Sequence, residues 1–310
     1  MDSQFEQLRT FAAVLDHGSF DAAARYLRIT PSAVSQRMKA LETAVGGVLV
    51  ERGKPARPTA SGQVILRLAR QVAALEAQAL RDLAAGTGDA ATAFARVPVV
   101  INGDSLTTWA LPALATMTAH RVSVEVHRED QDYSAALLRQ GTVMAAITSQ
   151  AQPVQGCLVR PLGRMRYRPM ASPGFVRTWF PDGATVEHLN DAPMVVFDRK
   201  DDLQDRYLRQ RTRRPLQPPR SAIPASADFA AAVRLGLGWG MVADQQYPHD
   251  DGSLVRIDPR RAIDVPLYWQ QWRLRSTPLR LLAEAVASAA TTSLSPYPAV
   301  KAAAGGVAAG

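Results

Sequence analysis

Short polar and basic side chains between residues 30 and 45 have the types and the spacing that can read DNA. In that segment Val34, Met38, Leu41 and Val45 recur at i, i+4, i+7 and i+11, which places them in one apolar stripe of a helix. The side chains off the stripe are Ser32, Ser35, Gln36 and Lys39, with Arg37 at its flank. Hydroxyls, an amide and cations can hydrogen-bond base edges and phosphates in a major groove. The pattern predicts a recognition helix, although many surface helices have the same two-faced pattern.

The neighbouring residues predict a helix-turn-helix that would hold this helix. Ser19 is a good N-cap for a helix that runs to about Leu27, and Thr30 followed by Pro31 is typical of a second helix start. Residues 4–16 have apolar side chains at helical spacing, so a further helix should pack under the pair. The expected core is Leu8, Phe11, Phe20, Ala23, Leu27, Val34, Met38 and Leu41.

Basic residues follow the helix pair. An apolar triplet, a basic turn and prolines between residues 48 and 58 are typical of a short two-stranded wing, which would complete a winged helix-turn-helix over residues 1–58. Cations there could reach phosphates or the minor groove, and a solvated loop explains the same residues. The candidate DNA contacts outside the second helix are Arg28, Arg52 and Arg57.

Residues 59–90 predict a long linker helix that ends at Gly86 and Gly88. Its apolar residues approximate a heptad seam, which suggests dimerisation. The seam consists of Val64, Leu68, Val72, Leu75, Ala79 and Leu83.

From residue 91 to 290, strand and helix patterns alternate, which predicts an α/β domain with a parallel sheet. The expected strands are 97–103, 122–127, 143–148, 166–172, 193–198, 254–258 and 265–274. The expected helices are 104–117, 132–141, 172–180, 201–211 and 277–290, and residues 226–243 should form a helix, a Gly-rich turn and a strand. We expect two lobes, one of residues 96–160 and 267–290 and one of 161–266, and a disordered Ala/Gly-rich tail at 291–310.

Polar residues stand where several of these strands end. Ligands of open α/β sheets bind beyond the carboxyl ends of strands. The hydroxyls at these strand ends suit the carboxylate of a ligand, and the acidic side chains suit a cationic group of a ligand. A basic amino acid carries both groups, so the set as a whole suits a basic amino acid. Each residue alone could instead be only a helix or loop cap, and the shared location at strand ends is what favours the set. The candidates are Asp104, Ser105, Thr108, Glu129, Asp130, Thr148, Asp198 and Ser226.

The totals favour a nucleic-acid partner and disfavour other classes. The 310 residues have a net charge of +8 and a pI near 10.0, which suits an anionic partner, although a high arginine content can have compositional causes. The lone Cys157 forms no internal disulfide, and we expect a buried structural thiol. No secretory signal or membrane span is evident, so we expect a cytoplasmic protein. Phosphate-loop, zinc and nucleophile motifs are absent from the sequence, so we expect no enzyme activity, no cofactor and no metal site.

The segment FAAVLDHGSFDAAARYLRITPSAVSQRMKALE resembles the N-terminal signature of LysR-type transcriptional regulators. The segments INGDSLTTWALPAL and VVFDRKDDLQ, and the pair Glu129-Asp130, look like the ArgP/LysG (IciA) branch. The resemblance implies a two-lobed periplasmic-binding-protein-like effector domain and a tetramer of two dimers on promoter DNA, with RNA polymerase as a possible further partner. It implies that Ser32, Ser35, Gln36 and Arg37 read or clamp DNA and that Ser105 and Thr108 bind the effector's carboxylate. Glu129, Asp130 or Asp198 would hold its cationic end.

The expected function is a sequence-specific transcriptional regulator that responds to lysine or arginine bound between the lobes. Its implied targets include genes such as an amino-acid exporter. Two alternatives stay open: a LysR-type regulator of a different small molecule, and a nucleoid-type protein that binds DNA without an effector.

Overall fold

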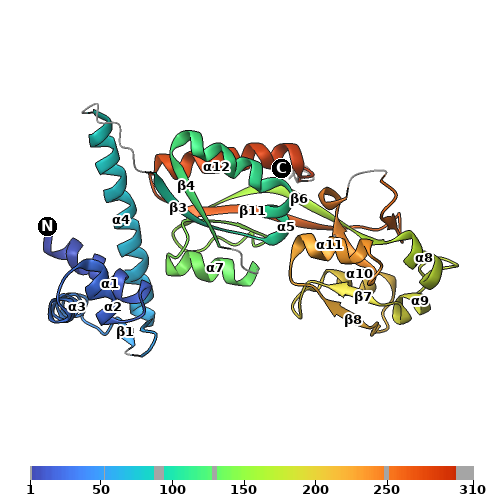
Figure 1. Ribbon diagram of the computed structural model, residues 1–310, viewed down its shortest axis with the longest axis horizontal. Helices are drawn as coiled ribbons and strands as arrows, with labels where there is room; N and C mark the ends of the chain where they lie inside the picture. The colour runs from blue at the N-terminus through green and yellow to red at the C-terminus, as the bar shows by residue number, and fades with distance from the viewer. Residues whose placement is uncertain (1, 52, 87–93, 128–130, 248–250, 298–310) are drawn as a thin grey trace, which may run out of the picture. The chain divides into compact units, whose positions relative to one another are not determined.

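The computed structural model describes residues 2–51, 53–86, 94–127, 131–247 and 251–297 (Figure 1). The chain divides into two compact units. Unit 1 is Met1–Arg160 with Tyr268–Ala289, and unit 2 is Pro161–Leu267 with Ala290–Gly310. Arg52, Glu129 and Asp130, which the sequence singles out, lie outside the described residues.

The head at the start of unit 1 consists of three helices and a hairpin. They are α1 (Asp2–Asp16), α2 (Phe20–Leu27), α3 (Pro31–Val45), β1 (Val50–Glu51) and β2 (Arg57–Pro58). Both predicted caps are present, because Ser19 Oγ accepts from the N–H of Ala22 and Thr30 Oγ1 from that of Ala33, each at 3.2 Å. Local signals therefore place this pair of helices within about one residue.

The predicted core of the head is confirmed by burial. Phe11, Ala23, Val34, Met38 and Leu41 are buried, with Leu8, Phe20 and Leu27 packed against them. Val45 is 40% exposed, so the apolar stripe of α3 ends at Leu41. The buried side of α3 therefore packs against the other helices of the head.

Helix α4 (Ala60–Gly86) follows the hairpin. Leu66 and Ala69 are buried, whereas most of the predicted seam is open. Val64 is 58%, Leu75 44% and Leu83 68% exposed. An exposed apolar seam is what a helix–helix partner would cover, so dimerisation through it stays a prediction.

The rest of unit 1 is a mixed sheet with helices around it. The strands β3 (Ala95–Ile101), β4 (Val122–His127) and β5 (Ala145–Thr148) are parallel, and β11 (Ile263–Trp272) is antiparallel to β5. Figure 1 shows α7 (Gln131–Gln140) on one side of these strands and α12 (Thr277–Ser293) on the other. The sequence predicted a parallel sheet, but the observed sheet is mixed. The reason is that the chain comes back from unit 2 as β11, which runs antiparallel to β5.

The predicted helix over 104–117 is four short segments. They are α5 (Gly103–Ser105), a π-helical turn η1 (Leu106–Ala110), α6 (Leu111–Ala115) and a 3-10 turn η2 (Thr116–His120). Pro112 has no N–H to donate to the carbonyl four residues earlier, so a regular α-helix cannot continue through it. Single π turns of this kind are frequent at functional sites.

Unit 2 is built on β6 (Cys157–Ala171), which pairs antiparallel with β9 (Gly240–Ala243) and β10 (Val255–Arg256). A separate parallel pair consists of β7 (Met194–Val196) and β8 (Arg220–Ala222). The helices are α8 (Pro173–Trp179), α9 (Val186–Asp191), α10 (Leu203–Arg211) and α11 (Ser226–Arg234), with a 3-10 turn η3 (Asp244–Gln246). Strand β6 is much longer than predicted, and α9 and β8 were not predicted.

The predicted disordered tail begins too early. Helix α12 continues to Ser293, and Leu294 is buried. Backbone hydrogen bonds of 2.8 and 3.0 Å then join Ser295 to Arg164. A Cβ at Gly163 would lie 2.8 Å from the Leu294 side chain, so this glycine makes room for the segment. Residues 298–310 lie outside the described residues.

Candidate DNA-binding surface and effector site

The solvent-exposed side of α3 is polar and does not pack into the core of the head. Ser32, Ser35, Gln36 and Lys39 are all exposed, while Val34 and Met38 between them are buried. The buried residues hold the helix against the head, and the exposed ones present hydroxyls, an amide and a cation. Such a side can enter a major groove and hydrogen-bond base edges.

Arg37 was expected to contact DNA together with these residues, but its side chain contacts the neighbouring helix α1 instead. Its Nη2 lies 2.6 Å from Oε2 of Glu6, and its Nη1 donates to the hydroxyl of Thr10 at 3.4 Å. Glu6 and Thr10 both belong to α1. Arg37 therefore ties α3 to α1, because its position at the flank of the apolar stripe turns it toward the neighbouring helix.

The other predicted cations lie around α3. Arg28 is exposed at the turn before it, with a left-handed φ of 56°, and Arg57 is exposed on β2. The one acid late in α3, Glu42, accepts a hydrogen bond from the N–H of Leu49 at 2.8 Å. This bond attaches the segment before the hairpin to α3 and occupies the carboxylate. Arg52 was predicted as well but lies outside the described residues.

In unit 1 two strand ends meet at one edge of the sheet. Ile101 of β3 pairs with Ile147 of the parallel strand β5, so Asn102 and Thr148 follow at the same edge. Thr148 is 3% exposed and Ser105, at the end of α5, is fully buried. The fold thus brings two predicted effector residues from distant parts of the chain to one edge.

Three buried polar atoms in residues 102–109, directly after β3, have no hydrogen-bond partner among the described residues. They are Oδ1 of Asn102, Oγ of Ser105 and Nε1 of Trp109. Leaving a buried polar group unpaired costs about 1–3 kcal/mol, so such groups call for a ligand, a water or an ion. Sequence reasoning missed Asn102 and Trp109. Asn102 directly follows a strand and could have been found by the rule that found Asp104.

Two further predicted residues, Asp104 and Thr108, lie near Ser105 in the chain. The hydroxyl of Thr108 donates to the backbone carbonyl of Asp104 at 2.6 Å, one helical turn back. The hydroxyl proton of Thr108 is thus used within the helix, and its contact with an effector carboxylate stays a prediction. Asp104 is half-buried in the first turn.

The predicted residues of unit 2 make contacts within their own unit. Oδ1 of Asp198 accepts from the N–H groups of Lys200 at 2.7 Å and Asp201 at 3.0 Å, which closes a loop after β7. Ser226 is buried, and its hydroxyl lies 2.7 Å from Nε2 of Gln246. The alternative reading of Asp198 as a loop cap is thus the observed one. Neither contact tests a ligand role.

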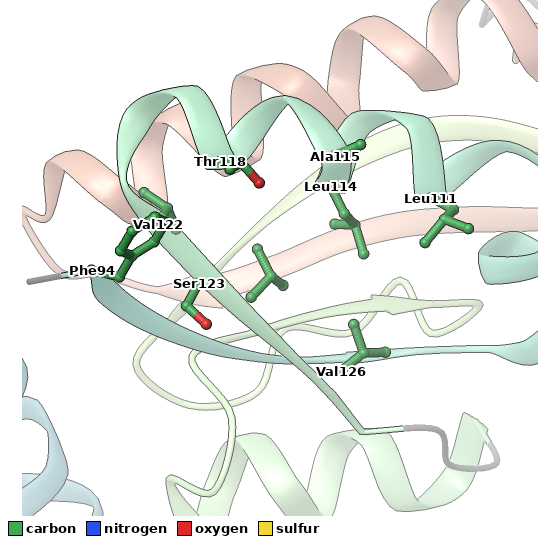
Figure 2. Close-up of a pocket in the computed structure, with 9 residues that line it drawn as sticks. Phe94, Leu111, Leu114, Ala115, Thr118, Val122, Ser123 and Val126 are labelled. Carbon is green, nitrogen blue, oxygen red and sulfur yellow. The ribbon is translucent and has the colours of Figure 1, made fainter.

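An apolar groove of about 390 Å³ lies along β4 (Figure 2). Its lining is Phe94, Leu111, Leu114, Ala115, Thr118, Val122, Ser123, Val124 and Val126. None of these side chains is charged and none was predicted to bind the effector. A charged amino acid has no ionic partner in this groove, so it is not the candidate effector site.

Cys157 is a buried free thiol. Burial raises its pKa to about 11, although the charges of Arg67 and Arg273 oppose the shift. Because the thiolate is the nucleophile, the thiol should stay protonated and unreactive at any pH well below 11. We expect the native protein at pH 8 to react with a thiol reagent far more slowly than the same protein in denaturant. Equal rates in the two states would contradict this placement.

The described residues contain neither a cluster of metal ligands nor a membrane-spanning helix. Within the described ranges, no group of three or more His, Cys, Asp and Glu side chains could hold a metal ion. No helix in the same ranges is long and apolar enough to cross a membrane.

Comparison with protein families assigns both parts of the chain. Residues 5–63 match the bacterial regulatory helix-turn-helix protein of the lysR family, and residues 96–291 match the LysR substrate binding domain. The chain belongs to the LysR family. It is a DNA-binding transcriptional regulator, and the predicted winged head with an α/β effector domain is confirmed.

Individual relatives narrow the branch. The HTH-type transcriptional regulator LysG of Mycobacterium tuberculosis is 45% identical over 287 residues, which are 92% of this chain and 93% of the relative. The lysine export transcriptional regulatory protein LysG of Corynebacterium glutamicum is 38% identical over 94% of this chain and 99% of the relative. A full-length LysG structure from Corynebacterium glutamicum with the bound effector Arg has a TM-score of 0.78 and 36% identity, covering 94% of this chain and 99% of that one. The predicted ArgP/LysG branch is confirmed, and these LysR-family relatives are regulators, not enzymes.

Proposed function

We propose that this LysR-family regulator changes its binding to promoter DNA when it binds L-lysine or L-arginine. The observation that carries the proposal is the group of unpaired buried atoms on Asn102, Ser105 and Trp109. The relatives support the choice of ligand, since one is named for lysine export and one was solved with arginine. Genes such as an amino-acid exporter are the proposed targets.

The three unpaired atoms suit the common part of an amino acid. The hydroxyl of Ser105 and the indole N–H of Trp109 can each donate to an α-carboxylate. Oδ1 of Asn102 can accept from an α-ammonium group. For the cationic side chain we retain Glu129, Asp130 or Asp198 as the proposed acids, with Asp104, Thr108, Thr148 and Ser226 as further candidates around the ligand.

The head would bind DNA through α3 and its basic surroundings. Ser32, Ser35, Gln36 and Lys39 are proposed to face the major groove, and Arg28, Arg52 and Arg57 the phosphates. A pair of chains joined through the seam of α4, and a tetramer of two such pairs, would place several heads on one promoter. We propose that the protein acts in the cytoplasm, with RNA polymerase as a further partner.

Removing the base-reading groups should reduce sequence discrimination. Each good bidentate contact is worth about 1–3 kcal/mol, so Gln36→Ala should narrow the affinity gap between specific and random duplexes by about 5- to 150-fold, with a smaller effect for Ser35→Ala. Gln63→Ala is a matched control, because Gln63 is exposed on α4. Quantitative footprinting checks this, and mutant footprints equal to wild type would refute the assignment of Gln36 and Ser35.

The effector claim is tested by thermal shift with each proteinogenic amino acid. A ligand at about 100 times its Kd stabilises the folded state by about 2.7 kcal/mol, so Lys or Arg should raise the Tm by several degrees. Leucine should leave the Tm unchanged, because its side chain has no charge to pair with an acid. An equal shift with leucine, or no shift with either cation, would overturn the proposed effector class.

A further inference from the structure

One arginine of α4 contacts both the DNA-binding head and the sheet domain of unit 1. Arg70, whose side chain is 22% exposed, forms a salt bridge with Asp16, the last residue of α1. Its Nη1 donates to the carbonyl of Gln140 at 3.2 Å and lies 3.1 Å from the hydroxyl of Thr142. A planar guanidinium holds such partners in fixed relative directions. The side chain therefore joins the end of α1 to the end of α7.

The contact between α4 and α7 is close at the level of the backbone. Gly141 follows α7 with φ of +75°, and a Cβ built there would lie 2.9 Å from the Cα of Arg67. A side chain at this position would push the two helices apart. Arg67 adds a bond from its Nη1 to the carbonyl of Gln155 at 2.8 Å. Arg70 thus lies within a packed contact, one helical turn along from Arg67.

Helix α7 leads from this contact toward the proposed effector residues. It begins at Gln131, directly after Glu129 and Asp130 in the chain, and ends at Gln140. Its 10 residues make a rod of about 15 Å at 1.5 Å per residue. It packs on β5 and β3, the strands that end at the edge with Asn102 and Thr148. A shift of one end of this rod moves the other end.

From these contacts we infer that Arg70 is a positioning residue that couples effector binding to the DNA-binding head. The inference rests on the proposed function. An effector that prefers one position of α7 would move Gln140 and Thr142, and Arg70 would pass the change to Asp16 and α1. Helix α3 follows α1 because Arg37 pairs with Glu6. The effector shifts the equilibrium only by its differential affinity for the two positions.

The test compares full-length wild type with Arg70→Ala on a duplex selected by the wild-type protein from a randomised library. The measured quantity is the ratio of DNA Kd values without and with saturating L-arginine or L-lysine. Such ratios are typically about 5- to 150-fold, and Arg70→Ala should bring the ratio to about one while calorimetry shows unchanged amino-acid binding. Asp16→Asn and Thr142→Val should lower the ratio in the same way.

Arg81→Ala is the matched control, because its Nη2 bonds to Gln78 of the same helix. It should keep the wild-type ratio. A wild-type ratio in Arg70→Ala would overturn the inference. If neither amino acid binds the wild type, the proposed function fails. The coupling role of Arg70 is then tested by hydrogen exchange, which needs no amino acid.

In that case DNA alone should alter exchange of the Gly141 and Thr142 amides, which bond to the carbonyls of Leu138 and Leu137. The change should occur in the wild type and be lost in Arg70→Ala. The same change in both proteins, or none in either, would overturn the coupling role.

Discussion

Replacing Ser105 with alanine should weaken amino-acid binding by about 10- to 150-fold, since a hydrogen bond to a charged group is worth about 1.5–3 kcal/mol. The hydroxyl is fully buried and has no partner among the described residues, so it is free to donate to a carboxylate. The substitution removes the donor and little volume. Calorimetric titration with L-arginine and L-lysine measures the effect.

Thr107→Ala is the matched control for Ser105. Thr107 is exposed in the following turn, and its hydroxyl bonds back to the carbonyl of Gly103 at 2.8 Å. Its removal should leave the Kd close to that of the wild type. If Ser105→Ala and Thr107→Ala bound the amino acid equally well, Ser105 would not be a ligand contact.

Phe11→Ala should destabilise the DNA-binding head by about 3–5 kcal/mol, the usual loss when a buried phenylalanine is truncated. Phe11 is fully buried in the core under α2 and α3. The lost contacts and the remaining cavity both act on the packing that positions α3. Phe5 on the same helix is 45% exposed, so Phe5→Ala should cost less than about 1 kcal/mol.

Hydrogen exchange of the amides in α1–α3 measures this loss where it occurs. Every tryptophan of the chain lies at or beyond residue 109, so tryptophan fluorescence does not report on the head directly. Faster exchange in Phe11→Ala than in Phe5→Ala, by the factor that 3–5 kcal/mol implies, is the expected result. Equal exchange in the two variants would contradict the assignment of this core.

The head could be predicted from the sequence because its signals are local. Ser19, Thr30 and Pro31 mark helix starts within a few residues of the chain, and Val34, Met38 and Leu41 reveal the buried side by their period. Local capping and periodicity need no knowledge of distant contacts. The order of head, linker helix and α/β domain along the chain could be predicted for the same reason.

The features that were missed depend on residues distant in the chain. Arg37 turns to Glu6 across two helices, and Ser295 pairs with Arg164 because Gly163 leaves room. The unpaired state of Trp109 depends on everything that packs around it. Sequence reasoning located the strand end that carries Ser105, but which atoms there lack partners required the folded chain.

The most direct test of the regulatory account is the effect of amino acids on DNA binding by the full chain. Fluorescence anisotropy with a selected, labelled duplex would give the DNA Kd alone and with L-lysine, L-arginine or L-leucine at equal concentration. We expect lysine or arginine to change the DNA Kd about 5-fold or more, which is the lower range of allosteric coupling, and leucine to leave it unchanged. A DNA Kd that is the same in all four conditions, or that leucine changes as much as the cations do, would contradict it.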